Sequence, residues 1–295
     1  MKSINLFVLA ALIVAWSCQP QKAKEETPEE IAEAPEPSLT KLWESDTTIM
    51  TPESVIYYEA DSTLYVSCIG AVPPDAKDGD GYIAKLSPSD GAIIDPMWVS
   101  GLHAPKGLGI LDGKLYVTNI DDIWEIDIES GEVLNTYPVE GASFLNDIDI
   151  SADGDIFISD SGTDKVHMLK DGTVSTVLES SEFNRPNGLL HMGDKMFMST
   201  SGSGNFYEIN TNDWTYKVVT DSIFGGDGVE LAGVDYLVSS WMGEVYYVAA
   251  NGNKTLMLDT KETANAADID YVSATNTVYV PTFFANQVVA YKLNK

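Results

Sequence analysis

The sequence is poor in positive charge. Its 295 residues include 17 Lys and Arg against 45 Asp and Glu, which gives a formal net charge of −28 at pH 7. Nucleic acid is excluded as a partner, because binding a phosphate backbone requires a basic surface that releases counterions. A basic amphipathic grip on anionic lipid is excluded on the same ground. We interpret the acidity as a solvated surface with a few carboxylates gathered to bind a cation.

Cysteine and histidine are also scarce, with two cysteines and three histidines. There is no cysteine cluster, no HExxH zinc motif, no GxSxG nucleophile elbow and no phosphate-binding Walker loop. These absences argue against a cysteine-type metal centre, a serine hydrolase and a P-loop enzyme. If Cys18 is lipidated, Cys68 is the only other thiol, and the fold must be stable without an intrachain disulfide.

The first eighteen residues predict an export signal. Lys2 is followed by a mostly apolar run over 4–16 that is too short to span a bilayer stably. An apolar run that ends in Ser17-Cys18 resembles a bacterial lipoprotein signal, although the bulky Trp16 departs from the usual pattern. We therefore expect export across the inner membrane and a lipid anchor at Cys18 in the cell envelope, periplasmic or on the outer-membrane surface. Plain cleavage and an uncleaved anchor are the alternatives.

Residues 19–39 are rich in Glu, Pro, Ala and Lys and carry almost no large apolar side chains. Such a segment cannot offset its ordering entropy by burial, so we expect a disordered tether. The predicted domains are a signal at 1–18, the tether at 19–39 and a folded domain at 40–295. The lipid anchor is the only membrane contact that we expect.

An internal repeat predicts the fold. The same pattern of two apolar-alternating strands around a turn begins at Lys106, Asn146, Asn187, Asp227 and Asp268, at spacings of 40 or 41 residues. A sixth copy begins at Glu53 and is the first repeat along the chain. This repeat is longer than the others because a loop over 70–81 interrupts it. Two more strand-like runs follow each pair. Six repeats of four strands predict an all-β, six-bladed β-propeller.

The last repeat stops after three strands. A strand at 38–45 can supply the missing outer strand. The sequence therefore predicts a ring that is closed by its N-terminal strand, which leaves no open sheet edge between the first and last blades.

The innermost strand of each blade lines the channel of a propeller, so the first residues of the six repeats should meet at one mouth. Five of these six residues carry oxygen donors, which a hard cation such as calcium requires. Three carboxylates and one lysine sum to −2, the complement of a divalent cation. We interpret Lys106 as a counter-ion rather than a catalytic amine. The set is Glu53, Lys106, Asn146, Asn187, Asp227 and Asp268.

The ends of the second strands form another equivalent set, which we expect to orient the ligands. The set is Cys68, Asn119, Asp160, Thr200, Ser240 and Thr282. Two alternatives stay open. Asn187-Gly188 and Asp227-Gly228 are also typical of turns. Trp241, Phe283 and Phe284 either wall a pocket or pack between blades.

Glu53 at the start of the first blade, RPNGLL around Asn187 and GGDGVE around Asp227 resemble the senescence marker protein, gluconolactonase and luciferin-regenerating enzyme family. More distantly, the chain resembles the diisopropyl fluorophosphatase and paraoxonase propellers. The resemblance spans nearly all of residues 45–295. It implies a calcium-type site on Glu53, Asn187 and Asp227, with Asn146 as a further ligand or a substrate contact. It also implies that Asp227 serves as the general base.

Two departures from the family pattern weaken the case for a sugar lactone. Glu53-Ser54-Val55 replaces the usual Glu-Gly-Pro, and Phe144 or Leu145 stands where an Arg often contacts sugar hydroxyls. We expect a monomeric hydrolase of lactones or related esters, similar to a gluconolactonase. Calcium, or else magnesium, manganese or zinc, would act as the Lewis acid. The alternative is a non-catalytic, envelope-anchored propeller with a structural metal that binds a protein or carbohydrate partner. A cavity wide enough for a small molecule would favour the enzyme.

Overall fold

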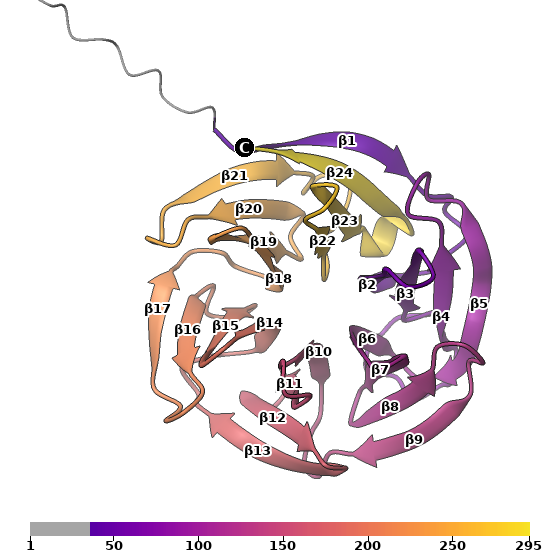
Figure 1. Ribbon diagram of the computed structural model, residues 1–295, viewed down its shortest axis with the longest axis horizontal. Helices are drawn as coiled ribbons and strands as arrows, with labels where there is room; N and C mark the ends of the chain where they lie inside the picture. The colour runs from indigo at the N-terminus through magenta and orange to yellow at the C-terminus, as the bar shows by residue number, and fades with distance from the viewer. Residues whose placement is uncertain (1–35) are drawn as a thin grey trace, which may run out of the picture. The chain divides into compact units, whose positions relative to one another are not determined.

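The computed structural model describes residues 36–295, which form six four-stranded antiparallel sheets arranged radially around a common centre (Figure 1). The predicted signal, Cys18 and the predicted tether through residue 35 lie outside the described residues. The single helical element in the described part is η1 (Phe283–Ala285), a turn of 3₁₀ helix. The prediction of an all-β propeller with six four-stranded blades is confirmed. No helix within residues 36–295 is long and apolar enough to cross a membrane.

The blades follow one another along the chain, and in blades 1 to 5 the innermost strand comes first (Figure 1). Blade 1 contains β2 (Pro52–Tyr58), β3 (Thr63–Cys68), β4 (Gly81–Leu86) and β5 (Ile93–Leu102). Blade 2 contains β6 (Pro105–Leu111), β7 (Lys114–Asn119), β8 (Asp122–Asp127) and β9 (Val133–Pro138). Blade 3 contains β10 (Leu145–Ile150), β11 (Ile156–Asp160), β12 (Lys165–Lys170) and β13 (Thr173–Glu179).

Blade 4 contains β14 (Pro186–Met192), β15 (Lys195–Thr200), β16 (Phe206–Asn210) and β17 (Tyr216–Thr220). Blade 5 contains β18 (Gly226–Ala232), β19 (Asp235–Ser240), β20 (Glu244–Val248) and β21 (Lys254–Asp259). Blade 6 contains β22 (Asp270–Val272), β23 (Thr277–Pro281), β24 (Val288–Asn294) and β1 (Ser38–Glu44).

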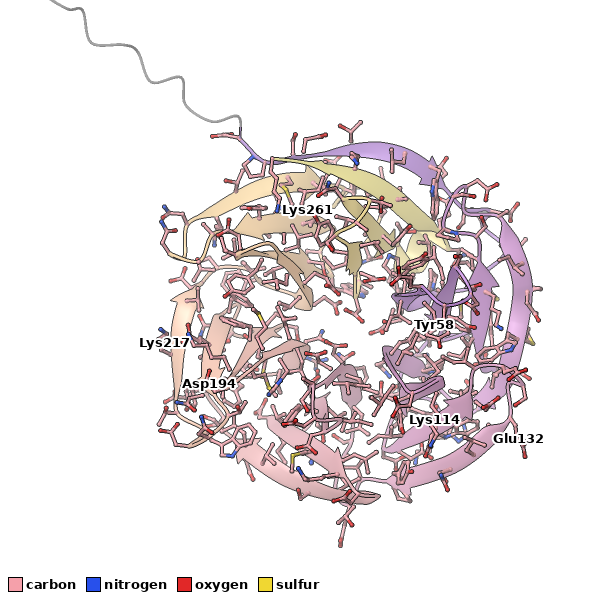
Figure 2. All side chains as sticks on the ribbon, in the orientation of Figure 1. Tyr58, Lys114, Glu132, Asp194, Lys217 and Lys261 are labelled. Atoms are coloured by element: carbon pink, nitrogen blue, oxygen red, sulfur yellow. The ribbon has the colours of Figure 1, made fainter. Side chains whose placement is uncertain are left out.

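The core lies between neighbouring blades. Tyr65 and Ile83 of blade 1, for example, pack with Leu108 and Val117 of blade 2 in one buried cluster. Successive side chains of a strand point to opposite faces of the sheet, and apolar side chains occupy both faces of a blade. Each blade therefore buries apolar surface against both of its neighbours. Charged side chains such as Lys217 lie at the periphery (Figure 2). The packing between blades leaves the inner strands fixed around the centre.

Strand β1 closes the ring. It pairs antiparallel with β24, from Ser38 opposite Asn294 to Glu44 opposite Val289. The indole of Trp43 on β1 donates a 3.2 Å hydrogen bond to the Pro88 carbonyl of blade 1, and its ring lies 5.7 Å from that of Tyr279 in blade 6. The predicted closure by the N-terminal strand is confirmed.

Candidate functional site

The same irregularity marks the start of five inner strands. The register between the first two strands of each blade shifts immediately around the first residue of the repeat, as between Pro186 and Leu189 in blade 4 and between Gly226 and Val229 in blade 5. Blades 1, 2 and 3 have the same shift. A bulge of this kind re-aims a side chain away from the regular pleat. The shifts fall at Glu53, Lys106, Asn146, Asn187 and Asp227.

These five residues line one cavity of about 450 Å³ at the mouth of the ring. We call it the mouth cavity. All five side chains are buried, with at most 6% of their surface exposed. The structure thus brings together five of the six residues that the repeat predicted to converge. The remaining lining residues are Ile69, Val72, Pro74, Phe144, Arg185, Ser201, Gly225, Trp241, Phe283 and Phe284.

Three oxygen atoms in this cavity have no hydrogen-bond partner. They are Oε2 of Glu53, Oδ1 of Asn187 and Oδ1 of Asp227. Only six buried side-chain atoms in the described residues lack a partner, and half of them are in this cavity. Leaving a buried acceptor unpaired costs about 1–3 kcal/mol. Three such acceptors from three blades therefore fit a cation bound between them.

The donor chemistry defines which cation fits. Two carboxylates and an amide supply oxygen only, which suits calcium, magnesium or manganese better than zinc, whose protein sites favour nitrogen and sulfur. Within residues 36–295 no three His, Cys, Asp or Glu side chains are grouped to hold a metal ion. A metal at the mouth would therefore depend on the Asn187 amide as its third protein ligand.

Asn146 is held differently from the other polar residues. Its side-chain amide donates a 3.1 Å hydrogen bond to Oγ of Ser161, and its backbone carbonyl accepts one of 2.5 Å from Oγ1 of Thr118. These contacts fix the side chain at the cavity wall. Asn146 is thus placed to serve as a ligand or as a substrate contact.

Burial dominates the electrostatics of the mouth cavity. It raises the pKa of Glu53 and Asp227, and Glu53 and Asp268 raise the pKa of Asp227 further. Burial also lowers the pKa of Lys106, against the attraction of Glu53 and Asp75. A divalent cation at the three unpaired oxygens would reverse the shifts of the carboxyl groups, because it favours their charged forms.

Lys106 is 1% exposed. Its Nζ donates to the carbonyls of Ala104 at 2.9 Å and Pro74 at 3.1 Å, and it lies 4.3 Å from the centre of the Phe144 ring. The carbonyl oxygens and the ring face compensate the buried charge. The role of Lys106 as a counter-ion stays a prediction.

Asp268 does not line the mouth cavity. It lines a second cavity of about 390 Å³ along the inner strands, which we call the acidic chamber, together with the carboxyl groups of Asp147, Asp149, Glu230 and Asp270. Blade 6 has no bulge at this point, because β22 begins only at Asp270 and Asp268 forms a parallel bridge with Ser54. Its Oδ2 accepts a 2.5 Å hydrogen bond from Oγ of Ser54.

The charge of the mouth therefore differs from the sequence-based sum of −2. Its lining holds two carboxylates, Glu53 and Asp227, and two cations, Lys106 and Arg185, which cancel. Arg185 was not anticipated, because it precedes the repeat start by two positions. Its guanidinium lies 5.7 Å from the centre of the Phe144 ring, at the exposed edge of the cavity.

The predicted ligand-orienting residues instead hold loops. Oδ1 of Asn119 accepts from the backbone of His103 and Ala104, the Asp160 carboxylate accepts from Phe144 N at 3.0 Å, and Ser240 donates to Phe224 O at 2.7 Å. Thr200 and Thr282 each bind the loop that follows their own strand, and Cys68 is a buried free thiol. Among the described residues, none of the six hydrogen-bonds the side chain of a candidate ligand.

The position one residue before this set, also on the second strand of a blade, contacts the inner strands directly. The hydroxyls of Thr118, Ser199 and Ser239 donate to carbonyls of the next blade, at Asn146, Asp227 and Ala267 respectively. A Ser or Thr occupies this position in five of the six repeats. That pattern is visible in the sequence and would have identified these residues.

The Asn-Gly and Asp-Gly pairs are not turns. Gly188 lies in β14 and Gly228 in β18. A Cβ on Gly188 would lie 1.9 Å from the carbonyl oxygen of Asp227, and one on Gly228 would lie 2.5 Å from the backbone nitrogen of Ile269. These glycines let inner strands of adjacent blades approach closely. The turn interpretation is wrong for both pairs.

No protein-family model matches this chain, and no curated protein matches it. A putative gluconolactonase structure matches with a TM-score of 0.66 and 18% identity, over 88% of this chain and 92% of that one. A gluconolactonase from Xanthomonas campestris matches with a TM-score of 0.64 and 16% identity, over 84% and 88%. Catalytically inactive virginiamycin B lyase from Staphylococcus aureus, with quinupristin, matches at 0.62 and 13%, over 88% and 100%.

At these identities the likeness shows a shared propeller fold. The resemblance of the sequence to the senescence marker protein and gluconolactonase family stays a prediction, as do the roles of its site residues.

Proposed function

We propose that this chain is a divalent-cation-dependent hydrolase of lactones or related esters. The observation that carries the proposal is the set of three buried, unpartnered oxygens on Glu53, Asn187 and Asp227 in one cavity. Similarity to gluconolactonase propellers supports the reaction class. The cavity of about 450 Å³ is large enough for a small molecule, which favours an enzyme over the non-catalytic binding alternative.

Glu53, Asn187 and Asp227 would hold the cation, with Asn146 as a fourth ligand or a contact to substrate. We assign calcium first, and magnesium or manganese as substitutes. When bound, the cation supplies Lewis acidity to the ester carbonyl.

Asp227 would act as the general base. In its charged form it accepts a proton from the water that attacks the ester carbonyl, and the proton then passes to the departing alkoxide. Ser199 donates to its backbone carbonyl and the bulge in β18 directs its side chain, so the carboxylate is held in position. Lys106 balances the charge of Glu53 at the cavity wall.

Calcium titration of EDTA-treated protein by calorimetry tests the cation site. We expect one site, lost or strongly weakened in Glu53→Gln and retained in Asp270→Asn, which alters a carboxyl of the acidic chamber. A panel of lactones and esters assayed with and without calcium tests the reaction. Calcium binding without hydrolysis of any panel member would support the non-catalytic propeller instead.

We also propose that the protein is a monomer, tethered to the cell envelope by a lipid on Cys18. The motive is the apolar segment that ends at Cys18. Cys18→Ala should release the protein from washed membranes. Retention of the variant in that fraction would contradict lipidation.

A further inference from the structure

The mouth cavity has two chemically different sides. From blade 5 through blade 6 to blade 1 its wall is apolar. Trp241, Phe283, Phe284, Ile69, Val72 and Pro74 form this side. From blade 2 to blade 4 the wall carries Lys106, Arg185 and Ser201 around the Phe144 ring. The unpartnered oxygens of the candidate cation site lie in the same cavity.

Three aromatic rings form the apolar side as one packed unit. The ring centres of Trp241 and Phe283 are 5.8 Å apart, those of Trp241 and Phe284 are 5.7 Å apart, and those of Phe283 and Phe284 are 4.8 Å apart. All three pairs meet edge to face, a favourable arrangement. Phe283 is buried in a cluster with Ile69, so this wall is formed before any ligand arrives.

The loops that carry the rings are tied together. The side chain of Asn265 donates to Trp241 O at 2.8 Å and accepts from Phe284 N at 3.4 Å. The η1 turn is closed by hydrogen bonds from Ala285 N to Thr282 O and from Oγ1 of Thr282 to Gln287 O. A wall on such connected loops is preorganised, which lowers the entropic cost of binding.

Large apolar side chains remain exposed on this side. Trp241 is 36% exposed, Phe284 58% and Val72 52%. Phe224 and Met242 are next in the chain to the lining residues Gly225 and Trp241, and they are 61% and 52% exposed. Exposed large apolar side chains beside a cavity are typical of a ligand-binding surface.

The wall chemistry points away from a polyhydroxylated substrate. Each sugar hydroxyl needs a hydrogen-bond partner to replace water, and Ile69, Val72, Pro74, Phe283 and Phe284 have no polar side-chain atoms to offer. An alkyl or aryl group would instead release water from both surfaces.

We infer that the substrate is a lactone or ester with an apolar alkyl or aryl group, which lies on the aromatic wall while its carbonyl faces the candidate cation site of Glu53, Asn187 and Asp227. The inference rests on the proposed function and specifies its substrate class. Lys106, Arg185 and Ser201 then face the polar part of the molecule.

Binding is tested separately from hydrolysis, with two lactams of the same ring size that resist hydrolysis, one unsubstituted and one carrying an octyl chain. Each methylene that leaves water for an apolar surface contributes about fourfold in affinity. With calcium-loaded protein, calorimetry should show the octyl lactam binding at least about 50-fold more tightly. Equal affinities would overturn the inference.

Variants locate the apolar group. Trp241→Ala/Phe284→Ala should lose at least about tenfold of the preference for the octyl lactam, whereas Val234→Ala, at an exposed turn between β18 and β19, should keep it. The conservative pair Trp241→Phe/Phe284→Leu should also keep most of it. If a folded, calcium-binding double alanine variant kept the full preference for the octyl lactam, the octyl group would have to bind elsewhere, and the inference would be overturned.

Activity separates the two proposals. We expect kcat/KM to rise from γ-butyrolactone to γ-undecalactone and to be low for gluconolactone. Hydrolysis with the opposite order would overturn the apolar preference and leave the hydrolase intact. Tighter binding of the octyl lactam than of the unsubstituted lactam, without hydrolysis of any lactone or ester, would support the apolar site and contradict the hydrolase.

Discussion

At the residue scale, one backbone irregularity presents five side chains of four kinds to one cavity. The bulge at the start of each inner strand is shared by blades 1 to 5, but the residue at that point is Glu, Lys, Asn, Asn or Asp. The backbone therefore defines where the side chains meet, and the side chains define the chemistry. Substitutions at these positions should change chemistry with little change of fold.

Asp227→Asn separates cation binding from base catalysis. The amide keeps an oxygen ligand but cannot accept a proton from water, so hydrolysis should fall by about 10²–10⁴-fold, while calcium affinity falls much less. Asn187 shows that an amide is tolerated at an equivalent position of the ring. The measurement is a lactone assay at saturating calcium, with metal content determined for each protein. A metal-loaded variant as fast as the parent would remove Asp227 from the mechanism.

Asp149 in the acidic chamber should make stability depend on pH. Burial raises its pKa from 3.8 to about 6, while hydrogen bonds from His191 N and Ile150 N oppose the rise. The folded protein therefore holds this proton more strongly than the unfolded chain. The free energy of unfolding should fall as the pH rises from about 4 to about 6.

Asp149→Asn should remove this contribution. The amide accepts only one of the two backbone hydrogen bonds, a loss that is the same at every pH. Relative to the parent, the free energy of unfolding of the variant should therefore be higher at pH 8 than at pH 4 by about 1–3 kcal/mol. Urea unfolding in EDTA at both pH values is the measurement. Asp194→Asn, at the exposed turn between β14 and β15 (Figure 2), is the matched control. A gain of stability that is the same at pH 4 and pH 8 would contradict this account.

Much of the candidate site could be predicted at this scale, because the repeat aligns equivalent residues. Glu53, Asn187 and Asp227 occupy the same register position, and the structure brings them to one cavity. Asp268 occupies the same position of its repeat, but the inner strand of blade 6 begins only at Asp270. Its side chain enters the acidic chamber instead. Arg185 and Phe144 come from irregular loops, whose side-chain directions do not follow from periodicity.

At the element scale, the spacing of the inner strands depends on glycine. Gly107, Gly188 and Gly228 each follow a bulge residue, and a Cβ at any of them would meet the inner strand of the next blade. From the sequence, the glycines after Asn187 and Asp227 suggested only turns. A turn and a close approach of two strands both favour glycine, and only the pairing of neighbouring blades distinguishes them.

Gly188→Ala should force β14 and β18 apart. The new Cβ would meet the Asp227 carbonyl oxygen at 1.9 Å, and backbone cannot yield as a side chain can. We expect a loss of about 2–3 kcal/mol in the free energy of unfolding by urea, with weaker calcium binding because Asn187 and Asp227 separate. Gly109→Ala, which meets only side-chain carbons of Ile148 and Ile150, should cost less. Equal costs for the two variants would contradict the role of backbone contact.

At the scale of the whole molecule, the ring is closed by pairing β1 with β24. Blade count and closure were predictable, because each repeat carries four strand-like runs and the last carries three. The closing strand was predicted at 38–45 and β1 occupies Ser38–Glu44, although the predicted tether ran to residue 39. Composition separates disordered from folded segments only to within a few residues, and pairing decides the rest.

Removing β1 should open the ring. A chain that starts at residue 45 lacks the partner of β24 and exposes its edge, so it should melt lower than a chain that starts at residue 36 and should self-associate. Trp43→Ala alone should lower Tm by about 5 °C, through lost packing against Tyr279 and the lost bond to Pro88. Differential scanning calorimetry and size-exclusion chromatography are the measurements. A monomer with unchanged Tm after deletion of β1 would contradict closure as a source of stability.

The pairing of β1 with β24 also sets an order of events during synthesis. Ser38 and its partner Asn294 are separated by 256 positions, so β1 cannot pair until β24 has been synthesised. Contacts of such long sequence separation form late and slowly. A chain whose synthesis ends before β24 leaves unpaired strand edges at both ends of the ring, which proteases and chaperones recognise. We therefore expect that only a chain translated through its final strand closes the ring and becomes resistant to degradation.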